Sequence, residues 1–329
     1  MASDADDLAT AVRAGDRRAL ARAITLVEST RADHRAEAHQ LVDSLLPHTG
    51  SAMRIGLSGV PGSGKSTLIE ALGLHAVAQG HSVAVLAVDP SSTRSGGSIL
   101  GDKTRMADLG RHPDAFIRPS PSSGTLGGIA RRTREAMLLC EASGFDVVLI
   151  ETVGVGQSEV AVADLVDLFL LVASPAGGDE LQGIKRGIME LADLIVVNKA
   201  DGDLEPAAHR AAADLQHAVH LLRPKRPGWE VTVTTCSART GAGLSSLWEA
   251  LTAAHERLRA NGLEELRAQQ STAWMWSEVT DTMLDRLRRA PSVRERVPEL
   301  EGAVARGELA PAVAAEQLLQ AFLREGDQA

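Results

Sequence analysis

Cysteine, lysine and aromatic residues are scarce in this chain of 329 residues, and tyrosine is absent. The two cysteines, Cys140 and Cys236, lie far apart and outside any paired Cys or Cys/His spacing, which argues against a disulfide framework and a thiolate zinc site. Aromatic residues make up 2% of the chain, so the core must be aliphatic. Lysine occurs five times against 29 arginines. A position that keeps lysine is therefore a candidate for a role that needs a compact charge on a flexible stem.

An excess of positive charge is also missing. The chain has 34 basic and 43 acidic side chains and a net charge of −9, so no global positive field exists to attract nucleic acid. The first residues are acidic where a secretory signal would begin with basic ones, and no window reaches the roughly 18 uncharged apolar residues of a membrane span. We expect a cytoplasmic protein that binds neither nucleic acid nor membranes.

Short apolar runs alternate with helical patterns through the middle of the chain. The runs predict strands at 53–58, 83–88, 115–118, 147–151, 168–173, 194–198 and 231–235. Helical periodicity occupies 66–79, 126–143, 180–191, 205–222 and 243–258. Runs that are apolar on both faces and alternate with helices indicate an α/β domain with a mostly parallel sheet covered on both sides.

Helical segments flank this domain. Residues 1–50 have apolar positions at helical spacing and predict two or three helices. The segment 256–329 reads as helices punctuated by Pro291, Pro298, Gly307 and Pro311. It packs either on the α/β domain, 51–255, or on a second copy of itself, because it is too short for a convincing core of its own.

The segment after the first predicted strand has the phosphate-binding pattern GxxxxGK[ST]. In such a P-loop, backbone N–H groups and a helix N-terminus hold phosphates. Lys65 would reach the β- and γ-phosphates as a catalytic charge, and Ser66 would ligate Mg²⁺. The nucleotide-binding candidates here are Gly59, Val60, Pro61, Gly62, Ser63, Gly64, Lys65, Ser66 and Thr67.

Two later segments select the base. Asn198, Lys199 and Asp201 match the NKxD pattern of GTPases, in which the carboxylate accepts hydrogen bonds from guanine N1–H and the 2-amino group. Adenine lacks this pair of donors. Ser237, Ala238 and Arg239 resemble the SA[RK] loop that backs the guanine in such proteins. We therefore expect GTP and GDP as ligands.

Carboxylates at strand ends predict a magnesium site. Glu151 occupies the slot that reads DxxG in most GTPases, and Asp89 ends the second strand. Asp102, in a polar glycine-rich segment, is a further candidate. Such a segment suits a switch that orders on the γ-phosphate. The expected metal ligands are Ser66, Asp89, Asp102 and Glu151, because hard oxygen atoms suit Mg²⁺.

A second glycine-rich segment, 177–185, follows the predicted strand at 168–173 and ends in one of the rare lysines. Loops after parallel strands line the ligand-binding edge of the sheet. Lys185 is therefore a candidate catalytic residue, which we interpret as a mobile contact to the nucleotide or a partner. Four of the five lysines thus fall in nucleotide-associated segments.

Taken together, these segments resemble those of the SIMIBI class of P-loop NTPases, and within it the MeaB/ArgK-type GTPases related to the methylmalonic aciduria type A protein. The resemblance spans nearly the whole chain. It is carried by GVPGSGKST at 59–67, AVDPSS at 87–92, GDKTRM at 101–106, ETVGVGQSE at 151–159, GDELQGIK at 178–185 and NKAD at 198–201.

The resemblance implies a low-activity GTPase that is a homodimer built through its C-terminal helices. It implies as partner an adenosylcobalamin-dependent acyl-CoA mutase, for which the GTPase acts as a chaperone that gates cofactor loading and protects or reactivates the mutase. Gln157, in the motif at 151–159, is a catalytic candidate on the same ground, beside Glu151.

Other functions give the same phosphate-binding loop. A nickel-type metal-insertion GTPase is expected to carry a His-rich tail or paired cysteines, and the sequence has neither. A small-molecule kinase or transport ATPase conflicts with NKxD. A regulator that binds GTP without hydrolysing it would look the same in sequence.

Overall fold

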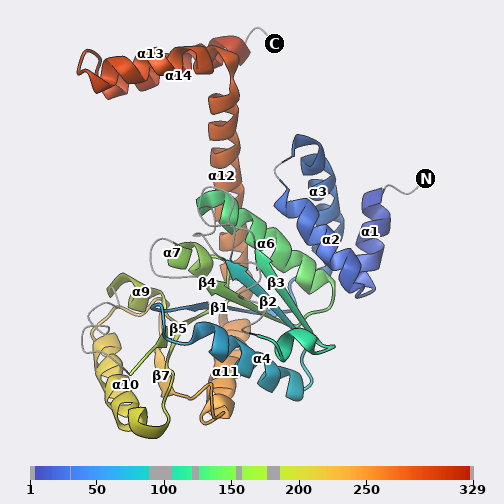
Figure 1. Cartoon of the computed structure of the whole chain (residues 1–329), viewed down its shortest axis with the longest axis vertical. Coiled ribbons are helices and arrows are strands. Elements are labelled where there is room, and N and C mark those ends of the chain that lie inside the picture. The colour runs from blue at the N-terminus through green and yellow to red at the C-terminus, as the bar shows by residue number, and fades with distance from the viewer. Residues whose placement is uncertain are drawn as a thin grey trace. The chain divides into compact units, whose positions relative to one another are not determined.

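A seven-stranded parallel sheet forms the centre of residues 1–270, which make one compact unit. The computed structural model describes residues 4–29, 31–88, 106–120, 126–152, 158–175 and 186–326. The strand order is β3-β2-β4-β1-β5-β6-β7 (Figure 1). The strands are β1 (Met53–Ser58), β2 (Val83–Val88), β3 (Ala115–Ser120), β4 (Val147–Thr152), β5 (Leu168–Ala173), β6 (Leu194–Val197) and β7 (Thr232–Thr235).

The central strands are buried on both faces. Every residue of β1, β4, β5 and β6 is buried, and successive side chains enter opposite cores. Phe169 and Leu171 point to one core, whereas Leu168 and Leu170 point to the other. This two-sided burial explains the continuous apolar runs that predict these strands.

Helices cover both faces of the sheet. On one face lie α6 (Leu126–Ala142), α7 (Ser158–Ala163), α9 (Arg186–Leu191) and α10 (Glu205–His220). On the other lie α4 (Lys65–Ala78) and α11 (Leu244–Asn261), with the 3-10 helix η2 (Leu109–Arg111) beside α4. Figure 1 shows α6 and α7 on the side of the sheet opposite α4 and α11. A further 3-10 helix, η3 (Gly202–Leu204), precedes α10.

Three aspartates line the amino-terminal edge of the sheet, each directly before a strand. The Asp146 carboxylate accepts a hydrogen bond from the Ser82 N–H at 2.8 Å. Asp167 accepts one from Arg54 N–H at 2.9 Å, and Asp193 one from Phe169 N–H at 2.8 Å. In each case the aspartate precedes one strand and the donor belongs to, or directly precedes, the neighbouring strand.

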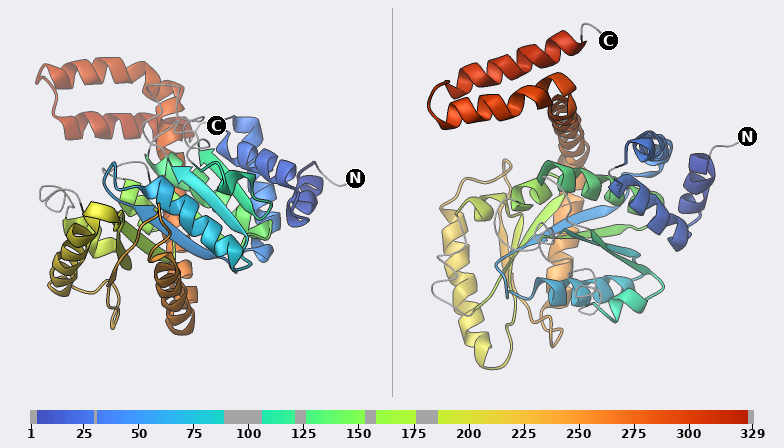
Figure 2. Two further views of the ribbon diagram at one scale, coloured as in Figure 1. Left: turned by 60° about the horizontal axis from the view of Figure 1, so that its bottom comes forward. Right: turned by 45° about the horizontal axis from the view of Figure 1, so that its top comes forward.

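The N-terminal helices pack on one another and on α6. They are α1 (Asp4–Arg13), α2 (Arg17–Glu28) and α3 (Ala32–Leu45), followed by the 3-10 helix η1 (Leu46–His48). Asp16 caps α2, because its carboxylate accepts hydrogen bonds from Arg18 N–H and Ala19 N–H. Both views in Figure 2 place these blue helices near the β3 side of the sheet and the yellow α10 near the β7 side.

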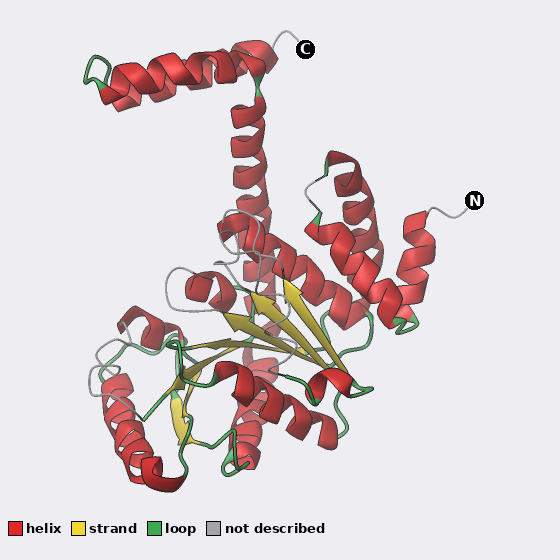
Figure 3. Cartoon of the chain, viewed as in Figure 1, coloured by secondary structure: helices red, strands yellow, loops and turns green. Residues whose placement is uncertain are grey.

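Residues 271–329 make a second compact unit. It holds the later part of α12 (Leu263–Arg289), together with α13 (Pro291–Ala305) and α14 (Pro311–Gly326). The last two helices pack against each other as a hairpin (Figure 3). Val293 and Leu300 of α13 and Ala314 of α14 are buried.

One predicted break in this region is wrong. Pro298 lies inside α13, although proline removes the hydrogen bond to the carbonyl four residues earlier. Its position is exposed, so water can hydrate the Arg294 carbonyl that proline leaves without a helical donor. The helix therefore continues to Ala305.

The strands and the helices at 66–79, 126–143, 205–222 and 243–258 are confirmed to within a few residues. The predicted helical segment at 180–191 is described only from 186 onward, as α9. The domain boundaries after residues 50 and 255 stay predictions. No helix of the described residues is both long and apolar enough to cross a bilayer.

Candidate nucleotide-binding site

The P-loop connects β1 to α4 at the carboxyl-terminal edge of the sheet, where ligands bind in open parallel sheets. Its glycines are required by space and by backbone conformation. A Cβ atom at Gly59 would lie 2.1 Å from the Val172 carbonyl oxygen. Gly64 has a φ of +85°, and a Cβ there would lie 2.7 Å from the Asn198 amide nitrogen. The loop therefore packs directly against the ends of β5 and β6.

Lys65 turns back over this loop. Its Nζ donates hydrogen bonds to the Gly59 carbonyl at 2.8 Å and the Val60 carbonyl at 3.2 Å. Burial lowers the pKa of Lys65, and the charges of Glu151 and Glu159 oppose that shift. An ammonium held among carbonyls beside a helix N-terminus can exchange those weak acceptors for phosphate oxygens.

Ser66 and Glu151 bring two oxygen atoms together at the start of α4. The Ser66 hydroxyl donates to Glu151 Oε1 at 2.8 Å. Glu151 is buried and lies in register with Leu57 on β1 and with Ala87 on β2. The adjacent Thr152 hydroxyl donates to the Ser58 hydroxyl at 2.9 Å, so the ends of β4 and β1 are joined beside the P-loop.

These oxygen atoms fit Mg²⁺, which prefers hard ligands and is commonly completed by water and phosphate. Among the described residues no group of three or more His, Cys, Asp or Glu side chains could hold a metal by itself. A hydroxyl and one carboxylate would therefore hold the ion together with nucleotide oxygens, and the remaining ligands would come from elsewhere.

Asn198 connects the P-loop to the two segments that the sequence predicts to select the base. Its amide nitrogen donates to the Ser63 carbonyl at 3.0 Å and the Gly64 carbonyl at 3.3 Å. Its amide oxygen accepts from Lys199 N–H at 2.8 Å and Ala238 N–H at 3.1 Å. Lys199, with a φ of +62°, donates from Nζ to the Gly62 carbonyl. The P-loop, the NKxD segment and the Ser237–Arg239 loop are thus held together through one buried amide.

Asp201 lies beside the P-loop, and both of its carboxylate oxygens accept hydrogen bonds. Ser237 donates to Oδ2, and Arg239 donates from Nε to Oδ2 at 3.2 Å and from Nη2 to Oδ1 at 2.7 Å. Hydrogen bonds from Ser237 and then Arg239 hold the pKa of Asp201 below its usual value. A cavity of about 660 Å³ opens here, lined by Gly64, Thr67, Asn198, Lys199, Asp201, Gly202, Asp203, Leu204, Ser237, Ala238 and Arg239.

The structure therefore brings the predicted P-loop, Glu151, the NKxD residues and the Ser237–Arg239 loop to one edge of the sheet. Four predicted site residues, Asp89, Asp102, Gln157 and Lys185, lie outside the described residues. Glu159 is a residue to which sequence reasoning assigned no role. It is buried on α7, and its charge acts on Lys65. Its only signal was its place at the end of the 151–159 motif.

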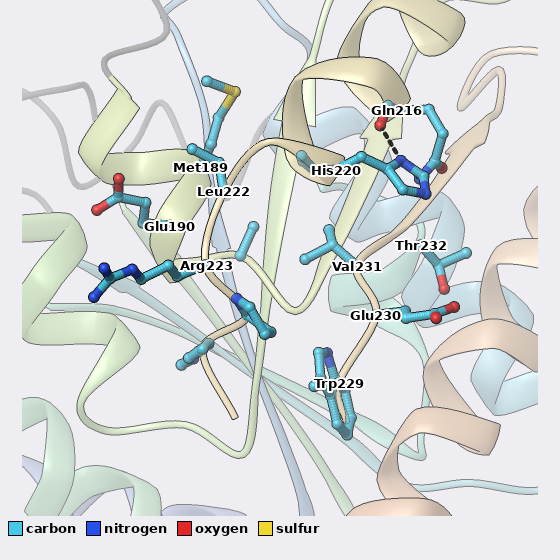
Figure 4. Close-up of a pocket in the computed structure, with 14 residues that line it drawn as sticks. Met189, Glu190, Gln216, His220, Leu222, Arg223, Trp229, Glu230, Val231 and Thr232 are labelled. Atoms are coloured by element: carbon cyan, nitrogen blue, oxygen red, sulfur yellow. Dashed lines mark hydrogen bonds between the residues drawn. The ribbon is translucent and has the colours of Figure 1, made fainter. Parts of the chain in front are cut away.

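A second cavity lies away from this site, at the amino-terminal ends of β6 and β7 (Figure 4). It measures about 440 Å³, and its lining includes His220, Arg223, Trp229 and Glu230. His220 Nδ1 lies 2.6 Å from the Gln216 carbonyl oxygen. The lining carries charges of both signs, and the phosphate-binding loop is at the opposite edge of the sheet.

Comparisons with known proteins agree with this geometry. The family model described as methylmalonyl-CoA mutase-associated GTPase MeaB matches residues 20–292. A Caulobacter vibrioides protein that is named as a GTPase is 58% identical over 323 residues, which cover 98% of each chain. The mouse mitochondrial methylmalonic aciduria type A homolog is 49% identical over 328 residues, 96% of this chain and 79% of that protein.

A solved structure is also similar over nearly the full length. The crystal structure of a protein described as LAO/AO transport system kinase has a TM-score of 0.78 and 39% identity, and the match covers 98% of this chain and 99% of that one. A family match over residues 20–292, supported by the P-loop and by relatives named as GTPases, identifies the chain as a GTPase of the MeaB family.

Proposed function

We propose that this GTPase is a chaperone of an adenosylcobalamin-dependent acyl-CoA mutase, methylmalonyl-CoA mutase or a close relative. In this role it gates cofactor loading and protects or reactivates the mutase. The observation that carries the proposal is the membership in a family described as mutase-associated, together with an intact nucleotide site. The mouse relative, named for methylmalonic aciduria, supports the same partner.

The chemistry is transfer of the γ-phosphoryl group to water. We infer that Asp201 selects guanine, with Ser237 and Ala238 behind the base, while the P-loop amides and Lys65 stabilise the phosphate charge. Ser66 and Glu151 would hold Mg²⁺, which neutralises charge on the β- and γ-phosphates when it is bound. Asp89 and Asp102 are proposed as further metal ligands. Gln157 and Lys185 are proposed as residues that complete the site.

The test is GTP turnover with and without purified mutase. We expect the mutase to raise kcat about tenfold or more, because partner-completed sites of this class gain much from added positioning groups. Lys185→Ala should bind GTP nearly as well as the unmodified protein and lose most of that stimulation.

Arg223→Ala is the matched control, since it removes one cation at an exposed position near the other edge of the sheet. It should be stimulated like the unmodified protein. Equal stimulation of all three proteins would remove Lys185 from the coupling. No response of any of them to a mutase would contradict the chaperone role.

We also propose that the protein is a homodimer built through its C-terminal helices. The part of α12 after residue 270 exposes apolar side chains at helical spacing, among them Met275, Val279 and Met283, and Trp276 is 62% exposed. On α14, Leu319 and Leu323 are exposed as well. Apolar surface that no neighbour covers is typical of an association site.

Sedimentation equilibrium tests the dimer. Leu323→Arg should shift the protein toward monomer, whereas Ala305→Arg, at the exposed end of α13, should leave the mass unchanged. A monomeric unmodified protein at micromolar concentration would contradict the proposal.

A further inference from the structure

Arg239 offers Asp201 the same pair of donors that guanine offers. Guanine presents N1–H and the 2-amino group on either side of C2, which is chemically a guanidine fragment. The Arg239 guanidinium presents Nε–H and Nη2–H on either side of its central carbon, at 3.2 Å and 2.7 Å from the two Asp201 oxygens. Both are planar forks that fit one carboxylate bidentately.

We propose that Arg239 is a latch on the base site: in the nucleotide-free protein its guanidinium occupies the Asp201 oxygens that accept guanine, and it must release them before a guanine nucleotide binds. The inference rests on the proposal that Asp201 reads guanine. It gives Arg239 a role opposite to that of a base-backing residue, since the side chain competes with the base.

The surroundings of the pair allow this exchange. Arg239 follows β7 and its side chain is 75% exposed, whereas the Asp201 side chain is only 14% exposed. The cavity of about 660 Å³ beside them leaves room for a base. The Ser237 hydroxyl donates to Oδ2 independently of Arg239 and can keep the carboxylate in place while the fork leaves.

The latch also has a reason to close. Without Arg239 the Asp201 carboxylate keeps the donor from Ser237 and loses two others, and each hydrogen bond to a charged group contributes to stability. Arg239 supplies two donors and a positive charge to Asp201 in the absence of the base. Guanine then replaces one bidentate contact by another.

The strength of the pair sets the size of the effect. Ion pairs with an exposed partner are weak, and closing this one should reduce the fraction of binding-competent protein by about fivefold at most. Apparent affinity falls by that fraction. Because the closed latch exists only before binding, the reduction appears in the association rate, equally for GDP and GTP.

Stopped-flow fluorescence with N-methylanthraniloyl-GDP tests this on the full-length protein. Arg239→Ala should raise the association rate constant about two- to fivefold and leave the dissociation rate constant unchanged. Arg239→Lys keeps the charge and removes the fork, so it should behave like Arg239→Ala. Arg223→Ala, an exposed arginine that lies outside the base cavity, should behave like the unmodified protein.

Salt gives a second readout. Raising the salt concentration to about 0.5 M should narrow the difference between the unmodified protein and Arg239→Lys, because screening opens an exposed ion pair and the two proteins carry the same charge.

Faster dissociation with unchanged association in Arg239→Ala would overturn the latch and show that Arg239 holds the bound base. Unchanged rates in both variants would overturn it too. Failure of the underlying proposal is visible separately: if the unmodified protein bound the adenine analogue as tightly as the guanine analogue, Asp201 would not read guanine.

Discussion

The ion pair between Arg267, near the start of α12, and Asp167 tests how burial changes the contribution of an ion pair to the free energy of unfolding. Arg267 donates from Nε to Asp167 Oδ1 at 2.9 Å and from Nη2 to Oδ2 at 2.7 Å, and the two side chains are 14% and 0% exposed. Arg31 and Asp33 form the same bidentate geometry, at 3.0 Å and 2.6 Å, with side chains 67% and 61% exposed. The two pairs differ in their access to water and in the further hydrogen bonds that the buried pair makes.

The magnitude follows from the partners that Asp167 would keep. Burial by itself would raise the pKa of Asp167, but the nearby His255 ring and the hydrogen bonds from Arg267 outweigh it and lower the pKa from 3.8 to about 2. That net shift corresponds to about 2 kcal/mol. In Arg267→Met, the Asp167 carboxylate keeps two partners, which are the Arg54 N–H and the His255 ring at 3.5 Å. The substitution also removes the hydrogen bonds from Arg267 to the carbonyls of Gly50 and Ala52. We expect Arg267→Met to lower the free energy of unfolding by about 3 kcal/mol at pH 7. This is the lower end of the range for removing one partner of a buried ion pair.

Urea unfolding followed by fluorescence of the buried Trp229 and Trp248 measures this loss. The matched variant Arg31→Met should change the unfolding midpoint very little. Because the folded-state pKa of Asp167 is depressed, its contribution is complete above about pH 4 and is lost as the pH falls toward 2. The difference in free energy of unfolding between Arg267→Met and the unmodified protein should therefore become smaller from pH 7 to pH 3. Equal losses for Arg267→Met and Arg31→Met, or a difference that does not change with pH, would refute the reasoning.

Three further outcomes follow from the nucleotide site and the core. Asp201→Asn should lower GTP affinity by about 10⁴-fold and favour xanthine nucleotides, as competition calorimetry would show; retained guanine preference would contradict the role of Asp201. Glu151→Gln should raise the Mg²⁺ concentration for half-maximal GTP turnover about tenfold or more, and an unchanged titration would move the ion elsewhere. Burial raises the pKa of Cys236 to about 12 and also raises that of Cys140, so a thiol reagent at pH 8 should label neither until urea unfolds the protein; rapid labelling of the folded chain would show that these thiols are accessible.

The sheet was predictable because its strands are buried on both sides. The run 168–173 is apolar at every position, and 147–151 is apolar up to Glu151, because these strands face two cores; few other elements require that pattern. The P-loop was predictable because steric limits at Gly59 and Gly64 leave glycine as the residue that fits. Pro298 misled because the packing of the helix, with Val293 and Leu300 buried, outweighs the local cost of one proline.

Side-chain partners were beyond the reach of sequence patterns. Asp167 and Arg267 are 100 positions apart, and neither belongs to a motif. Lys225, the one lysine outside the nucleotide-associated segments, forms an ion pair with the buried Asp193 at 3.0 Å. The scarcity of lysine pointed to positions with a specific role. The fold shows that Lys225 neutralises the buried carboxylate directly before β6. Asp201 was expected to face guanine, whereas its contact with Arg239 follows from how the loops after β6 and β7 meet.

The aspartates before β4, β5 and β6 bear on how this sheet could be rebuilt. A strand that is apolar on both sides can slide by one residue without exposing a polar side chain, so hydrophobic pattern alone distinguishes poorly between alignments. Each carboxylate penalises such a slip, because it would lose the backbone N–H that it meets in, or directly before, the neighbouring strand. A chimera that exchanges one of these strands with that of a distant relative should therefore carry the preceding aspartate across with the strand and, for Asp167 and Asp193, the basic residues that pair with it.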